Sequence, residues 1–176
     1  TATQAILSAA DVGATSGLFT LDAKLNKKSM DGLWQDYAGW AAAGMNWRGD
    51  DAANLTGVTG FQFKLGDLGT GNTNLVETVI FKVGVAGIDD ANVYQVNLPY
   101  SALGTSGKSF CIRPKDLKQP SYLLPEERSP LDLSKVTKLS WELKITNNND
   151  PEIDTATASV WLTDVSMYGL DKVCLN

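Results

Sequence analysis

Histidine is absent from this 176-residue chain. Because histidine supplies the base of Ser-His-Asp and Cys-His arrangements, many zinc ligands and the usual proton shuttle near neutral pH, its absence excludes most familiar hydrolase mechanisms. Glycoside hydrolysis by two carboxylates needs no histidine and stays open. Long apolar runs are also missing, and none approaches the ~20 residues of a membrane-spanning helix. We therefore expect no membrane partner.

Basic residues are fewer than acidic residues. The chain has 15 Lys and Arg against 20 Asp and Glu, a formal net charge of -5 and an isoelectric point of about 4.7. Such a field repels phosphate backbones, so no nucleic acid partner is expected. The first residues, Thr1 to Gln4, show neither an initiator Met nor a basic-then-apolar signal, as expected of an excised or processed chain.

Cysteine is scarce, with only Cys111 and Cys174 present. Two interpretations stay open at the level of sequence. The pair forms one disulfide in an exported protein, or the two residues remain buried thiols that act as small apolar groups, which a cytosolic protein would equally allow.

Short stretches of alternating apolar and polar residues, bounded by Gly, Asn, Asp and Pro, recur along the chain. A period of two predicts strands, and no stretch of ~12 or more residues holds a helical stripe. We predict an all-β fold, a two-sheet antiparallel β-sandwich (jelly roll), formed by a single domain over residues 1–176. The predicted strands are Gly39–Trp47, Gly60–Leu65, Thr78–Val85, Val93–Leu98, Lys138–Thr146 and Thr155–Thr163, with weaker ones near Gly17–Asp22 and Val165–Tyr168.

The longest stretch without a predicted strand runs from Gly104 to Ser134. It contains Arg113, Tyr122, Arg128 and four of the six prolines. A loop of this length inside a compact domain is usually functional or covers another part of the fold.

Alternation divides each predicted strand into an inner and an outer face. In Gly60–Leu65 the two phenylalanines and Leu65 point inward, whereas Gln62 and Lys64 point outward. Trp34 and Trp47 are assigned to the core as well. The residues predicted to line the space between the sheets are Phe61, Phe63, Phe81, Val83, Trp141, Leu143, Val160 and Leu162.

Two other tryptophans, Trp40 and Trp161, fall on outer faces among small neighbours. An uncovered indole offers a platform for the apolar face of a pyranose ring, and polar side chains beside it can bind the hydroxyl groups. The alternative for either tryptophan is packing beneath a loop. The polar side chains predicted to share one binding face with them are Gln62, Lys64, Lys82, Glu142 and Lys144.

The acidic residues carry weaker signals. Only Glu142 lies clearly on the proposed binding face, and alternation places no second acid opposite it, which counts against a two-carboxylate glycosidase. The pairs Asp50-Asp51 and Asp89-Asp90 could supply oxygen ligands to Ca²⁺, although no EF-hand spacing exists and surface solvation explains them equally well.

The order of several segments adds a resemblance. The segments are Ala38–Ala41, Gly60–Leu65, Val93–Leu103, Leu131–Val136 and Val160–Gly169. Together they resemble the family 11 carbohydrate-binding modules and the broader galactose-binding-like jelly rolls, from about Tyr37 to Gly169.

The resemblance implies a jelly roll whose concave face binds β-1,4 or mixed β-1,3/1,4-glucan chains and which is attached to a secreted hydrolase. It also implies that Trp40, Arg113 and Tyr122 bind sugar. The family's cleft histidines are missing, and Leu143 stands where its cleft tyrosine is expected. The family's structural Ca²⁺ ligands have no secure match.

The sequence thus favours a non-catalytic module that recognises soluble β-glucan, acts as a monomer within a larger multidomain enzyme, and is secreted or on the cell surface. No cofactor is required by this interpretation, apart from the calcium considered above. The alternatives are a protein-interaction or adhesion domain of a cell-surface assembly, and a carboxylate-based glycosidase.

Overall fold

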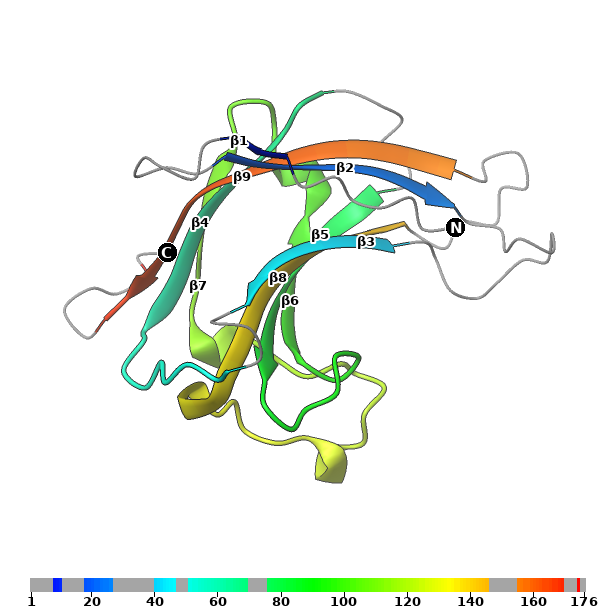
Figure 1. Cartoon of the computed structure of the whole chain (residues 1–176). Helices are drawn as coiled ribbons and strands as arrows, with labels where there is room; N and C mark the ends of the chain where they lie inside the picture. The colour runs from blue at the N-terminus through cyan, green and yellow to red at the C-terminus, as the bar shows by residue number, and fades with distance from the viewer. Residues whose placement is uncertain are drawn as a thin grey trace.

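The computed structural model describes residues 8–10, 18–26, 40–46, 51–69, 76–145, 155–169 and 174. These residues form two antiparallel sheets packed face to face (Figure 1). The fold is therefore the all-β sandwich that the alternation predicts. The five-stranded sheet has the order β1 (Ser8–Ala10), β2 (Leu18–Asn26), β9 (Thr155–Tyr168), β4 (Gly60–Asp67) and β7 (Lys108–Ile112). The four-stranded sheet has the order β3 (Trp40–Asn46), β8 (Val136–Ile145), β5 (Val76–Val85) and β6 (Tyr94–Pro99).

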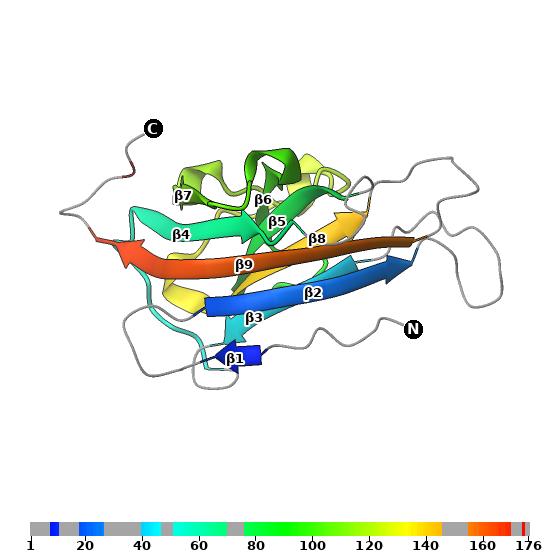
Figure 2. The same cartoon turned by 90° about the horizontal axis from the view of Figure 1, so that it is seen from above.

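The strand order is non-sequential. Figure 2 shows β9 between β2 and β4, so that segments from the two ends of the chain lie side by side. The two C-terminal stretches predicted separately form one strand, β9, with Asp164 at a φ of 55° inside it. The register against β4 shifts at this point, between Gln62 and Lys64, which is the geometry of a β-bulge.

The prediction of an irregular stretch from Gly104 to Ser134 is wrong in its first part, because β7 lies within it. This strand is only five residues long and sits at the edge of its sheet, beside β4. Phe110 and Ile112 supply its only inward alternation, too short a pattern to separate from a loop. The remainder contains the short 3₁₀ turns η2 (Pro114–Asp116) and η3 (Pro125–Glu127) and the start of η4 (Leu133–Lys135), and a further turn, η1 (Tyr100–Ala102), follows β6.

The core lies between the sheets and is built from inward residues of both. All the side chains predicted to line it are buried, from Phe61 to Leu162. Phe63, Phe81 and Trp141 form its aromatic centre, with ring centroids 4.9 to 5.3 Å apart. The core prediction is thus confirmed for Trp141, whereas Trp34 and Trp47 lie outside the described residues.

Cys111 and Cys174 form a disulfide, so the pair is not two free thiols. The bond joins β7 to a residue beyond the end of β9, across a sequence separation of 63. Gly60 leaves room for it, since a Cβ there would lie 2.3 Å from the Cys174 sulfur. In the part of the chain that the structure describes, no helix is long and apolar enough to cross a membrane.

Candidate functional site

The outer face of the four-stranded sheet forms an open groove of about 720 Å³. Every strand of this sheet contributes outward side chains to the floor, because alternate residues of a strand share one face. Two loops, one around Ala91 and one around Tyr122, form a wall. The floor residues are Ala42, Gly44, Asn46, Ile80, Lys82, Gln95, Lys138, Ser140, Glu142 and Lys144.

Small residues of β3 give the groove its depth. Gly44 pairs with Ser140 across the β3–β8 ladder, and a Cβ at Gly44 would lie 2.8 Å from the Leu139 carbonyl oxygen and 2.9 Å from the Ser140 Cβ. The backbone cannot give way to such a contact, so a side chain at this position would displace β3 from β8. Ala42, the register partner of Glu142, is a second small residue of β3 in the groove lining.

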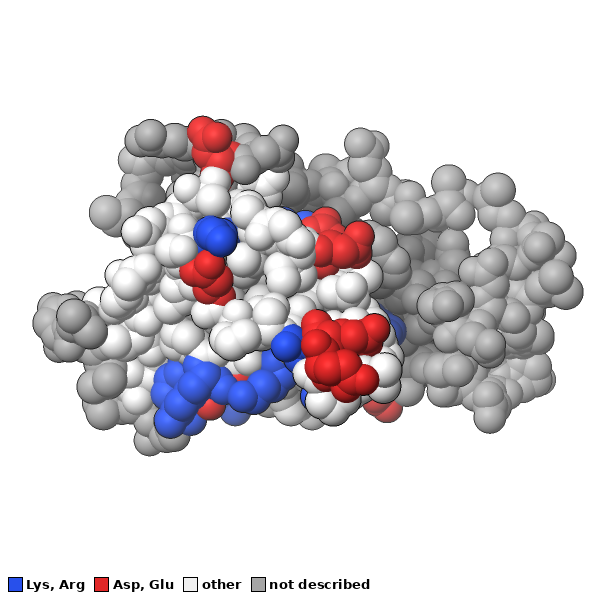
Figure 3. Space-filling model, turned by 90° about the horizontal axis from the view of Figure 1, so that it is seen from below, with Lys and Arg blue, Asp and Glu red and all other residues white. Residues whose placement is uncertain are grey.

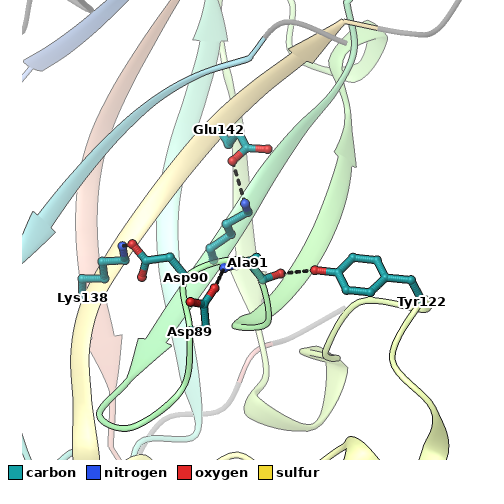
Figure 4. A network of polar contacts seen from close by, with 7 residues as sticks. Asp89, Asp90, Ala91, Tyr122, Lys138 and Glu142 are labelled. Carbon is teal, nitrogen blue, oxygen red and sulfur yellow. Dashed lines mark hydrogen bonds and ion pairs between the residues drawn. The ribbon is translucent and has the colours of Figure 1, made fainter. Parts of the chain in front are cut away.

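Two ion pairs hold charged side chains of the groove in fixed positions. The Lys82 Nζ lies 2.6 Å from a Glu142 carboxylate oxygen, and only 17% and 13% of these side chains are exposed. Lys138 forms a second pair, also 2.6 Å, with Asp90 from the loop before β6. Figure 4 shows Glu142 and Lys138 on neighbouring parts of this surface, with Asp90 beside Lys138.

Each pair leaves hydrogen-bonding capacity facing the groove. A lysine ammonium has three donors and a carboxylate has several lone-pair sites, so one mutual contact does not saturate either group. Ser140, Gln95 and Asn46 add neutral donors and acceptors. The groove can therefore bind a ligand with alternating donor and acceptor hydroxyls without needing a ligand charge.

Tyr122 is the aromatic residue on the wall. Its side chain is 66% exposed, and its hydroxyl hydrogen-bonds to the carbonyl oxygen of Ala91, as Figure 4 shows. The backbone around it is also held. The Arg128 guanidinium donates to the carbonyl oxygens of Ser121 (3.0 Å) and Leu123 (2.8 and 3.1 Å), on either side of Tyr122. The ring is thus presented in a fixed position with its face open.

The structure divides the predicted binding residues between opposite sheets, so the prediction of one shared face is wrong. Glu142, Lys144 and Tyr122 line the groove. Gln62, Lys64 and Trp161 belong to the five-stranded sheet, whose outer face points the other way. Alternation tells inside from outside for each strand, but it does not tell which sheet a strand joins. Trp40 begins β3 opposite Lys144, and its side chain lies outside the described part, so its role stays a prediction.

Trp161 packs on its own sheet. It pairs in register with Gly66, and a Cβ at Gly66 would lie 2.2 Å from the indole, while one at Gly107 would lie 2.3 Å from it. The indole therefore covers two glycines, and the Lys64 ammonium lies 5.5 Å from its ring centroid. Aromatic side chains commonly stabilise glycine in a sheet in this way.

Arg113 does not line the groove. It follows β7 and hydrogen-bonds both carboxylate oxygens of Asp116, at 2.6 and 3.2 Å. These hydrogen bonds lower the pKa of the Asp116 carboxyl. Arg113 is thus occupied by an internal partner, whereas Tyr122, from the same long segment, lies at the groove as the resemblance implied.

Several groove residues escaped the sequence reasoning. Lys138 and Asp90 form an ion pair between residues 48 positions apart, and no local pattern reveals such a contact. Gln95 alternates outward on β6 and could have been found by extending the face analysis to that strand. No group of three His, Cys, Asp or Glu side chains among the described residues could hold a metal ion, and calcium binding stays an untested prediction.

Three solved structures resemble this chain in fold. A family 11 carbohydrate-binding module from Clostridium thermocellum, in complex with a β-1,3-1,4-mixed-linked tetrasaccharide, is 12% identical with a TM-score of 0.53, over 89% of this chain and 85% of that chain. The family 11 module of the cellulosomal cellulase Lic26A-Cel5E of Clostridium thermocellum is 11% identical with a TM-score of 0.50, over 96% of each chain. The protein PfGH50B matches 99% of this chain with 23% of its own length, at 11% identity and a TM-score of 0.51.

No family model and no curated sequence matches the chain. The structural likeness shows that the chain has the β-sandwich fold of the family 11 carbohydrate-binding modules. The resemblance noted in the sequence is thereby confirmed for the fold.

Proposed function

We propose that this protein is a non-catalytic carbohydrate-binding module that holds a soluble β-glucan chain, β-1,4 or mixed β-1,3/1,4 linked, in the groove of the four-stranded sheet. The observation that carries the proposal is the Lys82–Glu142 pair in the groove floor, beside Ser140 and Gln95. These groups offer donors and acceptors with nearly balanced charge, which suits the hydroxyl rim of a neutral sugar.

Tyr122 supplies the complementary apolar surface. A pyranose ring needs an aromatic face for its C–H groups as well as hydrogen-bonding partners for its hydroxyls. The exposed and fixed ring of Tyr122 meets that need from the wall of the groove. The solved module that resembles this chain in fold was bound to a mixed-linked tetrasaccharide, which supports the choice of ligand class.

The ion pairing of the two carboxylates in the groove favours binding without catalysis. Asp90 and Glu142 line the groove, and each is held by a lysine. Hydrolysis by two carboxylates needs both of them to face the sugar, whereas each of these carboxylates makes a close ion pair with a lysine. We propose further that the module works as a monomer within a multidomain hydrolase that is secreted or on the cell surface, and the disulfide supports export.

The test is affinity electrophoresis in gels that contain barley β-glucan, xyloglucan, xylan or no polymer. We expect retardation in the β-glucan gel and unchanged polymer length after incubation. Tyr122→Ala should weaken binding about 2- to 10-fold, because losing one stacked aromatic costs about 0.5–1.5 kcal/mol.

The matched control is Leu124→Ala. Leu124 lies on the same segment and is 55% exposed, but it does not line the groove. Equal losses in the two variants would contradict the assignment of Tyr122. Absence of retardation in every polysaccharide gel would favour the protein-interaction alternative, and shortened β-glucan would favour the glycosidase.

A further inference from the structure

The segment that carries Tyr122 also borders a second hollow, of about 400 Å³, beside the edge of the sandwich. This size falls within the ~300–1,000 Å³ that small-molecule sites occupy. Tyr94, Gln119 and Ser129 form part of its wall, and the Tyr94 hydroxyl is anchored by the carbonyl oxygens of Ser129 and Pro130, both at 2.8 Å. The wall is thus preformed.

Three cations line the hollow and no acid does. They are Lys115, Lys118 and Arg128, and none forms a salt bridge within the described part of the chain. The neighbouring acid, Asp116, gives both carboxylate oxygens to Arg113. Figure 3, seen from below, shows basic side chains gathered next to an acidic group on one face of the molecule.

Arg128 is held in place by neutral partners. Its guanidinium donates to the carbonyl oxygens of Ser121 and Leu123, which fix its position without cancelling its charge. The adjacent Glu127 instead accepts a hydrogen bond from the backbone N–H of Leu124 at 2.8 Å. A fixed cation loses little side-chain entropy when an anion binds, which makes it a more effective partner than a free one.

The hollow therefore differs from the groove in its charge balance. In the groove, Lys82 and Lys138 are each paired with a carboxylate, and Lys144 alone of the three lining lysines forms no salt bridge with a described residue. In the hollow, none of the three cations forms a salt bridge with a described residue, in a protein whose formal net charge is -5. A neutral ligand would leave these charges as they are, whereas an anionic ligand would be attracted to them.

We propose that the hollow bordered by Lys115, Lys118 and Arg128 binds the anionic groups, carboxylate or sulfate, of an acidic polysaccharide. The choice of a polysaccharide over an acidic peptide rests on the proposed function of the groove, because both sites share the 118–131 segment. Lys118 joins that segment to β6 through two backbone hydrogen bonds with Gln95, a groove residue.

Affinity electrophoresis of the full chain tests this, with alginate as the carboxylate polymer, carrageenan as the sulfated polymer, barley β-glucan as the neutral one and poly-L-glutamate as an anion without sugar. We expect retardation by alginate or carrageenan, and the two gels tell which anionic group is preferred. Binding should be lost in about 1 M NaCl, where the Debye length is about 3 Å. Lys115→Ala and Lys118→Ala should each weaken it about 2- to 5-fold, as exposed charge pairs do.

Lys108→Ala is the control, because it removes the same charge from an exposed residue at the start of β7, outside the hollow. An equal loss with Lys108→Ala, or equal retardation by poly-L-glutamate, would overturn the proposal, as would absence of retardation in both acidic gels. Failure of the groove is recognised separately. Tyr122→Ala should weaken retention by β-glucan and leave retention by the acidic polymer intact. Retention of the unmodified chain by the acidic polymer and not by β-glucan would contradict the groove proposal only.

Discussion

Replacing Trp161 with alanine separates a structural role from a sugar-binding role. The indole covers Gly66 and Gly107 on the outer face of the five-stranded sheet, away from the groove. A fully buried tryptophan loses about 3–5 kcal/mol of stability when truncated to alanine. Trp161 is only partly buried, so we expect about half of that, ~2 kcal/mol.

This loss should appear as a lower melting temperature. For chains of about this length, 1 kcal/mol shifts Tm by about 2–4 °C, so Trp161→Ala should lower it by roughly 4–8 °C. Affinity for β-glucan, measured by titration calorimetry below the transition, should stay unchanged. Trp161→Phe should recover part of the stability, because a phenyl ring still covers one glycine.

Ser166→Ala is the control, since Ser166 is an exposed residue of the same strand. The reasoning would be refuted by an unchanged Tm together with weaker glucan binding. That outcome would support the prediction made from the sequence, in which the Trp161 indole binds sugar and does not stabilise the fold.

Two further predictions concern the ion pair and the disulfide. Glu142→Gln should lower the free energy of unfolding by about 1–2 kcal/mol, because it leaves the largely buried Lys82 ammonium without its carboxylate partner. In urea unfolding, the double variant Lys82→Met/Glu142→Gln should be more stable than Glu142→Gln alone, because it also removes the lysine charge. Replacing both Cys111 and Cys174 with serine should destabilise the protein by ~4 kcal/mol, from the chain entropy of a 63-residue loop, and lower Tm by roughly 8–16 °C. Calorimetry of the wild type with and without reductant should reproduce that shift, and an unchanged Tm would show that the bond carries no stability.

The sequence predicts inside and outside well because that distinction is local. Phe61 and Phe63 point inward and Gln62 outward by the geometry of a single strand, whatever pairs with it. In the structure both phenylalanines are 1% exposed, whereas Gln62 is half-buried. The same reasoning cannot tell that Gln62 and Glu142, both outward, lie on opposite faces of the molecule, because this depends on which strands pair across long separations.

The groove was only partly predictable for the same reason. Glu142 and Lys144 follow from alternation on one strand, and Tyr122 from a resemblance. The Lys82–Glu142 contact joins residues 60 positions apart, and it exists only because β5 and β8 are neighbours. Charged partners at such separation leave no periodic signal, so the balance of charge in the groove became visible only in the folded chain.

The division between inward and outward residues also explains how a fold can be kept at 12% identity. The core requires only apolar side chains of suitable volume, and many sequences meet that condition. Outward residues do not have to meet this condition. Most of the 118–131 segment does not either, apart from residues such as Leu131 that pack against the core, because the segment is held by its own hydrogen bonds and by backbone contacts to β6. Changes at Tyr122 or Lys118 would therefore alter a binding surface without altering the sandwich. The fold alone therefore does not determine the ligand, which depends on the side chains of the groove and the hollow.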